Sequence, residues 1–347
     1  MARVITSPEQ FKIIGENIHT TRIVLRNGQR AVTLPDGNEA VPFKGDDGED
    51  RMLTVPEWFK NTQPYSQGQI KHFMIAARKG IDGGPDEQQE GAAYVRYEVR
   101  RQARAGAHFL DLNVDEISYQ LEIQKRAMRW LVKVVEAVSP VPPSIDSSNA
   151  EIIAEGLAAY TGKAGRPMIN SLALERIETL DLVKKHKAHV IVTAAGASGM
   201  PSDDEERAEN IGQLMEAALK RDVPKDDIHI DALVFPISVD PRYGNHYFDA
   251  VRSIRKKWGK EVHIGGGLSN VSFGLPKRKL INDAFIHLGL DAGIDSGIID
   301  PVQSKIKDVF EFDPNTEASK YAIDMLTGKD EFCVNFIQAF RDGKLGK

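Results

Sequence analysis

Short apolar segments that end in polar residues recur along this chain, and amphipathic stretches of helical period separate most of them. The segments that we expect to be strands are residues 11–17, 109–114, 143–148, 168–172, 190–194, 228–234, 262–266 and 292–299. The helix-like stretches between them include residues 88–105, 122–138, 150–159, 174–186, 204–221 and 247–257. Strands that alternate with helices indicate a parallel sheet, and eight such repeats predict a closed (β/α)₈ TIM barrel. An open, doubly wound sheet is the alternative.

One interval interrupts this alternation. Residues 22–85 lie between the first strand and its helix, which is far longer than an ordinary loop. Turn residues at 26–28 and 35–38 predict a small hairpin system. The later part carries several aromatic rings and an imidazole, namely Trp58, Phe59, Tyr65, His72 and Phe73. Because so many rings disfavour disorder, we expect an ordered insertion that acts as a lid, or else an oligomer contact or a decorative insertion.

We therefore predict a single TIM-barrel domain over residues 1–347, with the 22–85 insertion within it and a C-terminal helical extension at 303–347. A composition of 41% hydrophobic residues supplies ample material for a core, and the net charge of −5 disfavours a nucleic-acid or anionic-membrane partner. We find no apolar run of about 18 residues and no signal-peptide pattern, so we expect a cytoplasmic protein.

The single cysteine, Cys333, excludes a disulfide within one chain and a zinc site of several thiolates. Cys333 lies in an apolar run, which favours a buried and inert thiol.

The chain also contains a glycine-rich strand end. The apolar residues 262–264 lead into Gly265-Gly266-Gly267, and Leu268-Ser269-Asn270-Val271-Ser272 follows. Three glycines let a backbone approach a ligand closely or adopt conformations closed to other residues, and an asparagine offers both a donor and an acceptor. Taken alone, the segment is equally well interpreted as a surface turn.

The carboxyl ends of all strands of a TIM barrel meet on one face, so their terminal residues share one pocket. The polar residues at these ends are Glu16, Asn17, His19, Asp111, Asn113, Asp115, Glu116, Asp146, Ser147, Ser148, Asn149, Asn170, Ser171, Thr193, Asp231, Ser269, Asn270, Ser272, Asp295 and Ser296. Carboxylates beside amides suit a flat heterocycle with several ring N–H groups and a carbonyl. Each aspartate by itself is more commonly a helix cap, and residues 146–149 fit that role.

Other chemistries fit less well. The histidines lie at unrelated spacings, so we predict no metal site, with a hard-cation site at the aspartates as the alternative. No serine lies in a G-x-S-x-G elbow, and the three glycines match neither a dinucleotide nor a P-loop fingerprint.

The segment Gly267-Leu268-Ser269-Asn270-Val271-Ser272 resembles the hallmark of the methyltetrahydrofolate:corrinoid methyltransferases and of the folate domain of cobalamin-dependent methionine synthase. Other strand ends follow in the same order, namely Ile14-Gly15-Glu16-Asn17, Asp111-Leu112-Asn113-Val114, Ile145-Asp146-Ser147-Ser148, Ile169-Asn170-Ser171, Ile230-Asp231 and Gly293-Ile294-Asp295-Ser296-Gly297-Ile298. The resemblance covers about residues 10–20 and 90–310. Dihydropteroate synthase is less similar, because its serine-arginine-lysine motif is not found here.

The resemblance implies a pterin-binding TIM barrel in which Asp146, Asn170 and Asp231 hydrogen-bond the ring edge of the folate. It places the catalytic Asn270 beside N5, the atom that carries the methyl group. Arg278 matches a basic position near the folate or the corrinoid partner. The strand-end residues Asp111, Asn113 and Ser272 complete the predicted substrate-binding set.

The expected activity is methyl transfer, in either direction, between 5-methyltetrahydrofolate and the cobalt of cobalamin. We find no Asp-x-His-x-x-Gly motif, so a separate corrinoid protein is expected to carry the cobalamin. The resemblance also implies a homodimer. The alternatives are a condensation like that of dihydropteroate synthase and a non-catalytic folate-binding protein.

Overall fold

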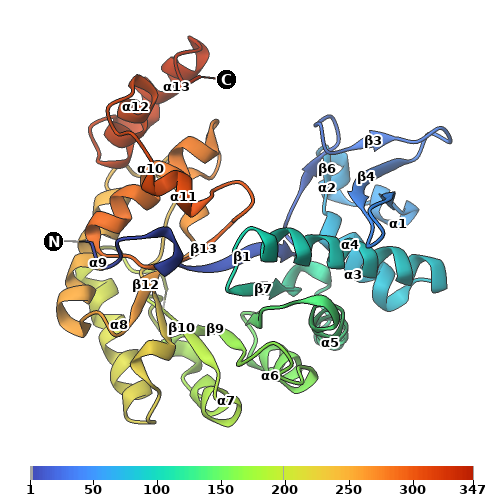
Figure 1. Cartoon of the computed structure of the whole chain (residues 1–347), viewed down its shortest axis with the longest axis horizontal. Helices are drawn as coiled ribbons and strands as arrows, with labels where there is room; N and C mark the ends of the chain where they lie inside the picture. Colours follow the sequence, from blue (N-terminus) through green and yellow to red (C-terminus); the bar gives the residue numbers. More distant parts are fainter. Residues whose placement is uncertain (1–2, 198, 347) are drawn as a thin grey trace. The chain divides into compact units, whose positions relative to one another are not determined.

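Eight β/α repeats make up most of the computed structural model, which describes residues 3–197 and 199–346 (Figure 1). The parallel strands of these repeats are β1 (Lys12–His19), β7 (Phe109–Asn113), β8 (Pro143–Asp146), β9 (Met168–Leu172), β10 (His189–Thr193), β11 (Ile228–Asp231), β12 (His263–Gly265) and β13 (Ser296–Ile299). The helices that follow them in turn are α4 (Pro85–Arg104), α5 (Leu121–Val138), α6 (Ala150–Ala159), α7 (Thr179–His186), α8 (Asp204–Leu219), α9 (Tyr243–Trp258), α10 (Arg278–Ala292) and α11 (Ile306–Phe310). The fold is therefore the predicted α/β fold of the (β/α)₈ TIM-barrel class.

The chain divides into two compact units, which we call the amino-terminal unit (residues 15–168) and the carboxyl-terminal unit (residues 1–14 and 169–347). In the amino-terminal unit β8 is parallel to β7, and Asn113 lies opposite Asp146 in the register. In the carboxyl-terminal unit β10, β11 and β12 are neighbours, and Asp231 lies between Thr193 and Gly265. Strands that are consecutive in the chain are thus neighbours, whereas a doubly wound sheet reverses its strand order.

The hydrophobic pattern explains these elements. All five residues of β7 are buried, as expected for a parallel strand covered on both faces. On α5 the residues Ala127, Met128, Leu131, Val132 and Val135 are buried, and their spacing forms one apolar stripe. In the carboxyl-terminal unit α8, α9 and α10 flank the strands in the same way (Figure 1).

The 22–85 insertion contains its own strands and helices. They are β2 (Val24–Leu25), β3 (Val32–Thr33), β4 (Glu39–Lys44), β5 (Asp50–Thr54), α1 (Glu57–Lys60), α2 (Gln63–Ser66), β6 (Gln69–Ile70) and α3 (His72–Asp82). Strands β3, β4 and β5 form an antiparallel sheet, and α3 packs on α4. The buried Lys79 joins these parts, since its Nζ donates to Thr54 Oγ1 and Glu90 Oε1, each at 2.6 Å.

The C-terminal extension contains α11, α12 (Glu317–Leu326) and α13 (Val334–Arg341). Helix α12 packs on α9 and α10. The thiol of Cys333 is buried, as predicted, and burial raises its pKa to about 11.

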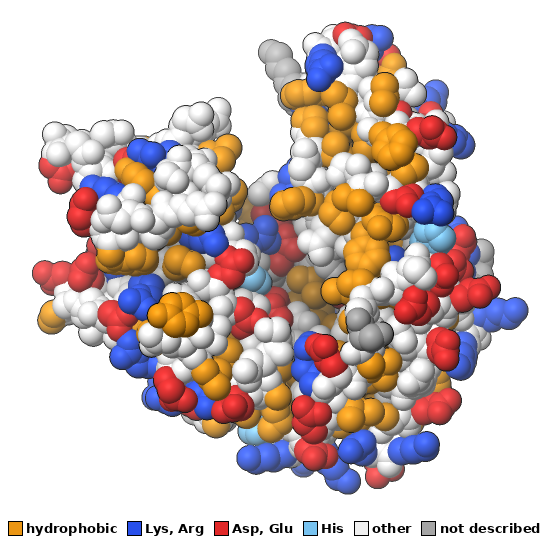
Figure 2. All heavy atoms as spheres, turned by 180° about the vertical axis from the view of Figure 1, so that it is seen from behind, with side chains coloured by type: hydrophobic (Ala, Val, Ile, Leu, Met, Phe, Trp, Pro, Cys, Tyr) orange, Lys and Arg blue, Asp and Glu red, His pale blue; other side chains and the backbone are white. Residues whose placement is uncertain are grey.

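The face shown in Figure 2 mixes acidic, basic and hydrophobic side chains. Within the described ranges, the helices are too short or too polar to cross a membrane.

Candidate functional site

In the amino-terminal unit, Asp146 ends β8 and lies beside Asn113, which ends β7. Asn113 Nδ2 donates to Asp146 Oδ2 at 2.9 Å, while Asn113 and Asp111 are themselves buried. Burial, and then the charge of Asp111, raise the pKa of Asp146 well above its usual range. Two carboxyl groups that repel each other in this way favour a shared proton or a ligand that donates hydrogen bonds.

A second carboxylate holds the loop after β8 in place. Asp115 accepts from the hydroxyls of Ser147, at 2.6 Å, and Ser148, at 2.9 Å, and from the Ser148 backbone N–H. Asn149 then caps α6 by accepting from the Glu151 N–H at 2.8 Å. Of the predicted capping segment, Asn149 is therefore the residue that caps the helix, and Asp146 is left for other contacts.

His19, at the end of β1, lies 3.7 Å from Asp146 through its Nε2. Burial, and then the charge of Arg22, lower the pKa of His19 to about 4. The imidazole is therefore neutral at pH 7, so this contact is not an ion pair.

In the carboxyl-terminal unit, Asp231 ends β11 next to Gly265 of β12 and the two glycines that follow it. Its Oδ1 accepts from the Leu233 N–H at 2.8 Å, and burial raises its pKa to about 6. A Cβ at Gly266 would lie 2.2 Å from this oxygen, and Gly266 has a φ of +135°. Residue 266 must therefore be glycine for the Asp231 carboxylate to take this position.

The other two glycines also make room for atoms of the protein itself. A Cβ at Gly265 would lie 2.1 Å from the Ser296 carbonyl oxygen, and one at Gly267 would lie 2.8 Å from Asn270 Nδ2. Gly266 adopts a conformation closed to other residues, as one of the two alternatives for the glycines predicts. The space beside the three glycines is used by a neighbouring strand and by the side chains of Asp231 and Asn270.

Asn270 lies in η5 (Leu268–Ser272), a turn of 3₁₀ helix that begins after the two residues following β12. The other four residues of this turn are buried, and Asn270 is exposed. The turn is held from outside by Arg278, whose Nε donates to Ser272 Oγ at 3.0 Å and whose Nη2 donates to the Ser269 carbonyl at 2.8 Å. The Asn270 amide is thus presented to solvent by a turn whose other side chains are fixed.

These contacts refine two of the predicted substrate-binding residues. Ser272 is fully buried, and its hydroxyl bonds to the Ser269 carbonyl and to Arg278. We therefore interpret Ser272 as a brace of the turn and Arg278 as its outer support. Asn170 lies half-buried in β9, as the strand pattern predicts.

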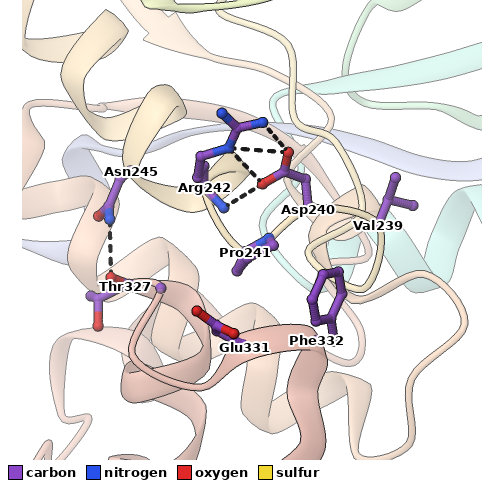
Figure 3. A pocket seen from close by; sticks show the side chains of 9 residues that line it. Val239, Asp240, Pro241, Arg242, Asn245, Thr327, Glu331 and Phe332 are labelled. Carbon is purple, nitrogen blue, oxygen red and sulfur yellow. Dashed lines mark hydrogen bonds and ion pairs between the residues drawn. The ribbon is translucent and has the colours of Figure 1, made fainter.

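A pocket of about 450 Å³ lies elsewhere in the carboxyl-terminal unit, between the loop after β11 and the turn after α12 (Figure 3). Its charged side chains include Asp240 and Arg242, which pair with each other at 2.6 Å, and Arg242 lowers the pKa of Asp240 to about 2. The predicted site residues do not line it. Because this ion pair is satisfied internally, we assign the pocket no role in the chemistry.

Within the described part of the chain, no group of three or more His, Cys, Asp or Glu side chains is arranged to hold a metal ion. The strand-end aspartates instead bond to amides, hydroxyls and backbone N–H groups, as Asp146, Asp115 and Asp231 do. The donor set is thus suited to an organic ligand with hydrogen-bonding edges.

The family model described as "Pterin binding enzyme" matches residues 84–300 of this chain. The chain belongs to this family. The matched range contains β7 to β13 and the strand ends described above, with the exception of those of β1. Part of the 22–85 insertion and the C-terminal extension lie outside it.

The curated relatives of this pterin-binding enzyme agree with the resemblance that the strand ends indicated. A methylcorrinoid:tetrahydrofolate methyltransferase of Eubacterium limosum is 29% identical over 265 residues, which are 75% of this chain and 91% of that protein. The methionine synthase of Mycobacterium leprae (strain TN) is 31% identical over 216 residues, which are 58% of this chain and 17% of that protein.

Solved structures support the fold alone. A dihydropteroate synthase of Xanthomonas albilineans in complex with 7,8-dihydropteroate has a TM-score of 0.51 and 19% identity, covering 66% of this chain and 86% of that one. A dihydropteroate synthase of Stenotrophomonas maltophilia has the same TM-score and 18% identity, covering 65% and 87%.

Sequence reasoning missed one polar residue of this pterin-binding enzyme, Arg207 on α8. The residue was detectable, because it occupies the apolar face of the helix that the pattern predicted. Its spacing to Ile211, Leu214 and Met215 is that of one buried stripe. An arginine on such a face is a signal of a buried cation, which is rare unless it is paired.

Proposed function

We propose that this pterin-binding enzyme transfers a methyl group between N5 of 5-methyltetrahydrofolate and the cobalt of a corrinoid that a separate protein carries. The family match and the methyltransferase from Eubacterium limosum support this activity. The observation that carries the proposal is the exposure of Asn270 in a turn whose other residues are buried. A turn with this sequence and this exposed amide is suited to hold a donor beside a reacting nitrogen.

The chemistry requires such a donor. N5 of methyltetrahydrofolate is a tertiary amine and leaves poorly unless it gains positive character. A hydrogen bond to N5 that strengthens as negative charge develops there stabilises the transition state more than the ground state. We assign this role to the Asn270 amide, which donates without being an acid. The proton that N5 finally retains would come from water or from the strand-end carboxyl groups.

We assign recognition of the ring edge to Asp146, Asn170 and Asp231, as the resemblance implies. The pKa values of Asp146 and Asp231 are both raised, mainly by burial. Hydrogen bonds donated by ring N–H groups would therefore stabilise the ionised form of each carboxyl group. Asp111 and Asn113 act with Asp146 from the neighbouring strand. We propose that Ser272 and Arg278 act through the turn, because both bond within it.

We propose the same residues for both directions of transfer, since the forward and reverse reactions share one transition state. The names of the relatives support a corrinoid partner. We also propose a homodimer, and a lid role for the 22–85 insertion. The contacts of Lys79 with Thr54 of the insertion and with Glu90 of α4 support an ordered subdomain.

Transfer to free cobalamin tests the proposal. Purified enzyme would be mixed with 5-methyltetrahydrofolate and Co(I) cobalamin, and in the reverse direction with tetrahydrofolate and methylcobalamin, and the cobalamin absorbance would be followed. The wild-type enzyme is expected to catalyse both. Asn270→Ala should slow transfer about 10²- to 10³-fold, the typical cost of removing a transition-state donor, while the folate Kd changes only a few-fold.

Two results would redirect the assignment. Folate binding without transfer to free cobalamin or to any corrinoid protein would favour a non-catalytic folate-binding protein. Condensation of a pterin diphosphate with p-aminobenzoate would instead establish synthase chemistry. An equal loss of binding and transfer in Asn270→Ala would contradict the role of Asn270.

A further inference from the structure

Arg207 is a buried cation whose donors are largely unused. The residue is 1% exposed, and its Nε and Nη1 have no hydrogen-bond partner among the residues that the structure describes. Leaving a buried polar group unbonded is costly, and the cost is larger for a charged group. Such a group requires an explanation, and a hydrogen-bond acceptor from outside the chain is one.

A second buried arginine of the same unit provides the contrast. Arg255 is 4% exposed and uses all three of its nitrogens. Its acceptors are the carbonyl oxygens of Gly259, Val262 and Gly293 and the carboxylate of Asp295, at 2.6 to 3.0 Å. Arg255 is therefore a structural residue that is complete without a ligand, whereas Arg207 is incomplete.

The surroundings of Arg207 connect it to the predicted site. Its guanidinium lies 5.0 Å from the centre of the Phe235 ring, on the loop that follows β11. The charge of Arg207 also lowers the pKa of Asp231, at the end of β11, and so opposes the effect of burial. Oδ1 of Asp231 accepts a hydrogen bond from the Leu233 N–H and not from Arg207.

The charges of two other carboxylates, Asp204 and Asp203, raise the pKa of the Arg207 guanidinium, but each of them also bonds to another group. Asp203 accepts from the Glu206 N–H at 2.9 Å, and Asp204 lies 3.3 Å from His246 Nδ1. Asp203, Asp204 and Asp231 together offset part of the effect of burial on the pKa of Arg207, which is lowered. None of them accepts a hydrogen bond from Nε or Nη1 of Arg207 in the described chain.

We propose that Arg207 is a substrate-binding residue that donates to the C4 carbonyl oxygen of the pterin ring. This inference rests on the proposed folate-binding function. In a pterin the C4 carbonyl is adjacent to the N3–H group, so an acceptor and a donor lie side by side on one edge. A carboxylate such as Asp231 suits the donor, and a neighbouring guanidinium suits the acceptor.

Folic acid and aminopterin test this assignment, because they differ at this edge of the ring. Folic acid carries an oxo group at C4 and a hydrogen on N3, whereas aminopterin carries an amino group at C4 and no hydrogen on N3. Their Kd values would be measured by calorimetry for wild type, Arg207→Met and Arg207→Lys. Arg207→Met should bind folic acid about 10- to 100-fold more weakly, the equivalent of one charged hydrogen bond, and bind aminopterin no more weakly than wild type. Arg207→Lys should fall between the two, because it keeps the charge but loses the planar fork.

Arg255→Met is the matched control, since it also removes a buried guanidinium. It should lower the melting temperature and leave the ratio of the two Kd values unchanged. The melting temperature of each variant separates loss of folding from loss of recognition, and Arg207→Lys keeps the test valid if Arg207→Met does not fold.

The possible results separate the inference from the function on which it rests. Equal losses for both ligands, or no loss for either, would overturn the role of Arg207 and leave folate binding intact. If Arg207→Met also bound p-aminobenzoylglutamate, which lacks the pterin ring, more weakly than wild type does, Arg207 would be assigned to the tail of the folate instead. Failure of wild-type enzyme to bind folic acid, tetrahydrofolate or 5-methyltetrahydrofolate would overturn both proposals.

Discussion

The carboxylate of Asp231 lies in the space that a side chain at residue 266 would need. A Cβ at Gly266 would be 2.2 Å from Asp231 Oδ1, and the φ of +135° at Gly266 is unfavourable for any residue with a side chain. The two residues are 35 positions apart in the chain, yet each fixes what the other can be. The glycine-rich strand end thus serves to position a carboxylate of the proposed site.

Gly266→Ala is expected to destabilise the fold and to weaken pterin binding together. The backbone strain costs about 1–3 kcal/mol, and the displaced carboxylate loses its bond to the Leu233 N–H. Gly274→Ala is the control, because Gly274 has a φ of +80° but no described atom within 4 Å of its Cβ position. Chemical denaturation and pterin Kd would be measured for both. Equal pterin affinity in the two variants would contradict the steric role of Gly266.

Gly267→Ala should separate catalysis from folding. Gly267 has a φ of −74°, which alanine adopts readily, and the clash is with the mobile end of the Asn270 side chain at 2.8 Å. The amide should therefore rotate away at little cost to the fold, within about 0.5 kcal/mol of wild type. We expect kcat to fall with little change in folate Kd. A Gly267→Ala enzyme with wild-type kcat would show that the position of the Asn270 amide is not critical.

Pterin affinity should depend on pH through Asp231. Burial raises the pKa of Asp231 to about 6, and the ionised carboxylate is the form that accepts from ring N–H groups. Affinity should therefore rise as the pH rises through about 6, and fall about 10-fold one unit below it. The Kd of 6-methylpterin measured between about pH 5 and about pH 7.5 checks this. Asp231→Asn should bind weakly with this dependence removed, and a wild-type profile that is flat near pH 6 would refute it.

Asp146→Asn should stabilise the free enzyme at neutral and alkaline pH. The folded-state pKa of Asp146 is raised by burial and by Asp111, so its ionisation opposes folding. The protonated Asp146 contributes fully to the stability of the fold below its unfolded-state pKa of about 4. This contribution is lost as the pH rises through the folded-state pKa. The advantage of Asn in melting temperature should accordingly be largest near pH 8 and vanish near pH 4. The same variant should bind pterin more weakly, and a pH-independent difference in stability would contradict the assignment.

The elements and their order could be predicted from the sequence because both depend on local patterns. The strand expected at 109–114 is observed at Phe109–Asn113, and the helix expected at 150–159 is observed at Ala150–Ala159. Apolar runs and helical periods are set by neighbouring residues, and each strand-end motif spans only a few residues. For the same reason, the motif that contains Asn270 could be recognised in the sequence, and its place beside N5 is our proposal.

Contacts between distant segments could not be predicted in this way. The sequence by itself determined the β/α alternation, the family, and a set of polar strand ends that contains Asp146, Asp231 and Asn270. Tertiary structure decided that Gly266 makes room for Asp231, that Arg278 and Ser272 brace the turn of Asn270, and that Nε and Nη1 of Arg207 are buried with no hydrogen-bond partner among the described residues. The physical reason is that steric exclusion, desolvation and hydrogen-bond satisfaction depend on which segments meet in space, and local periodicity contains no record of that.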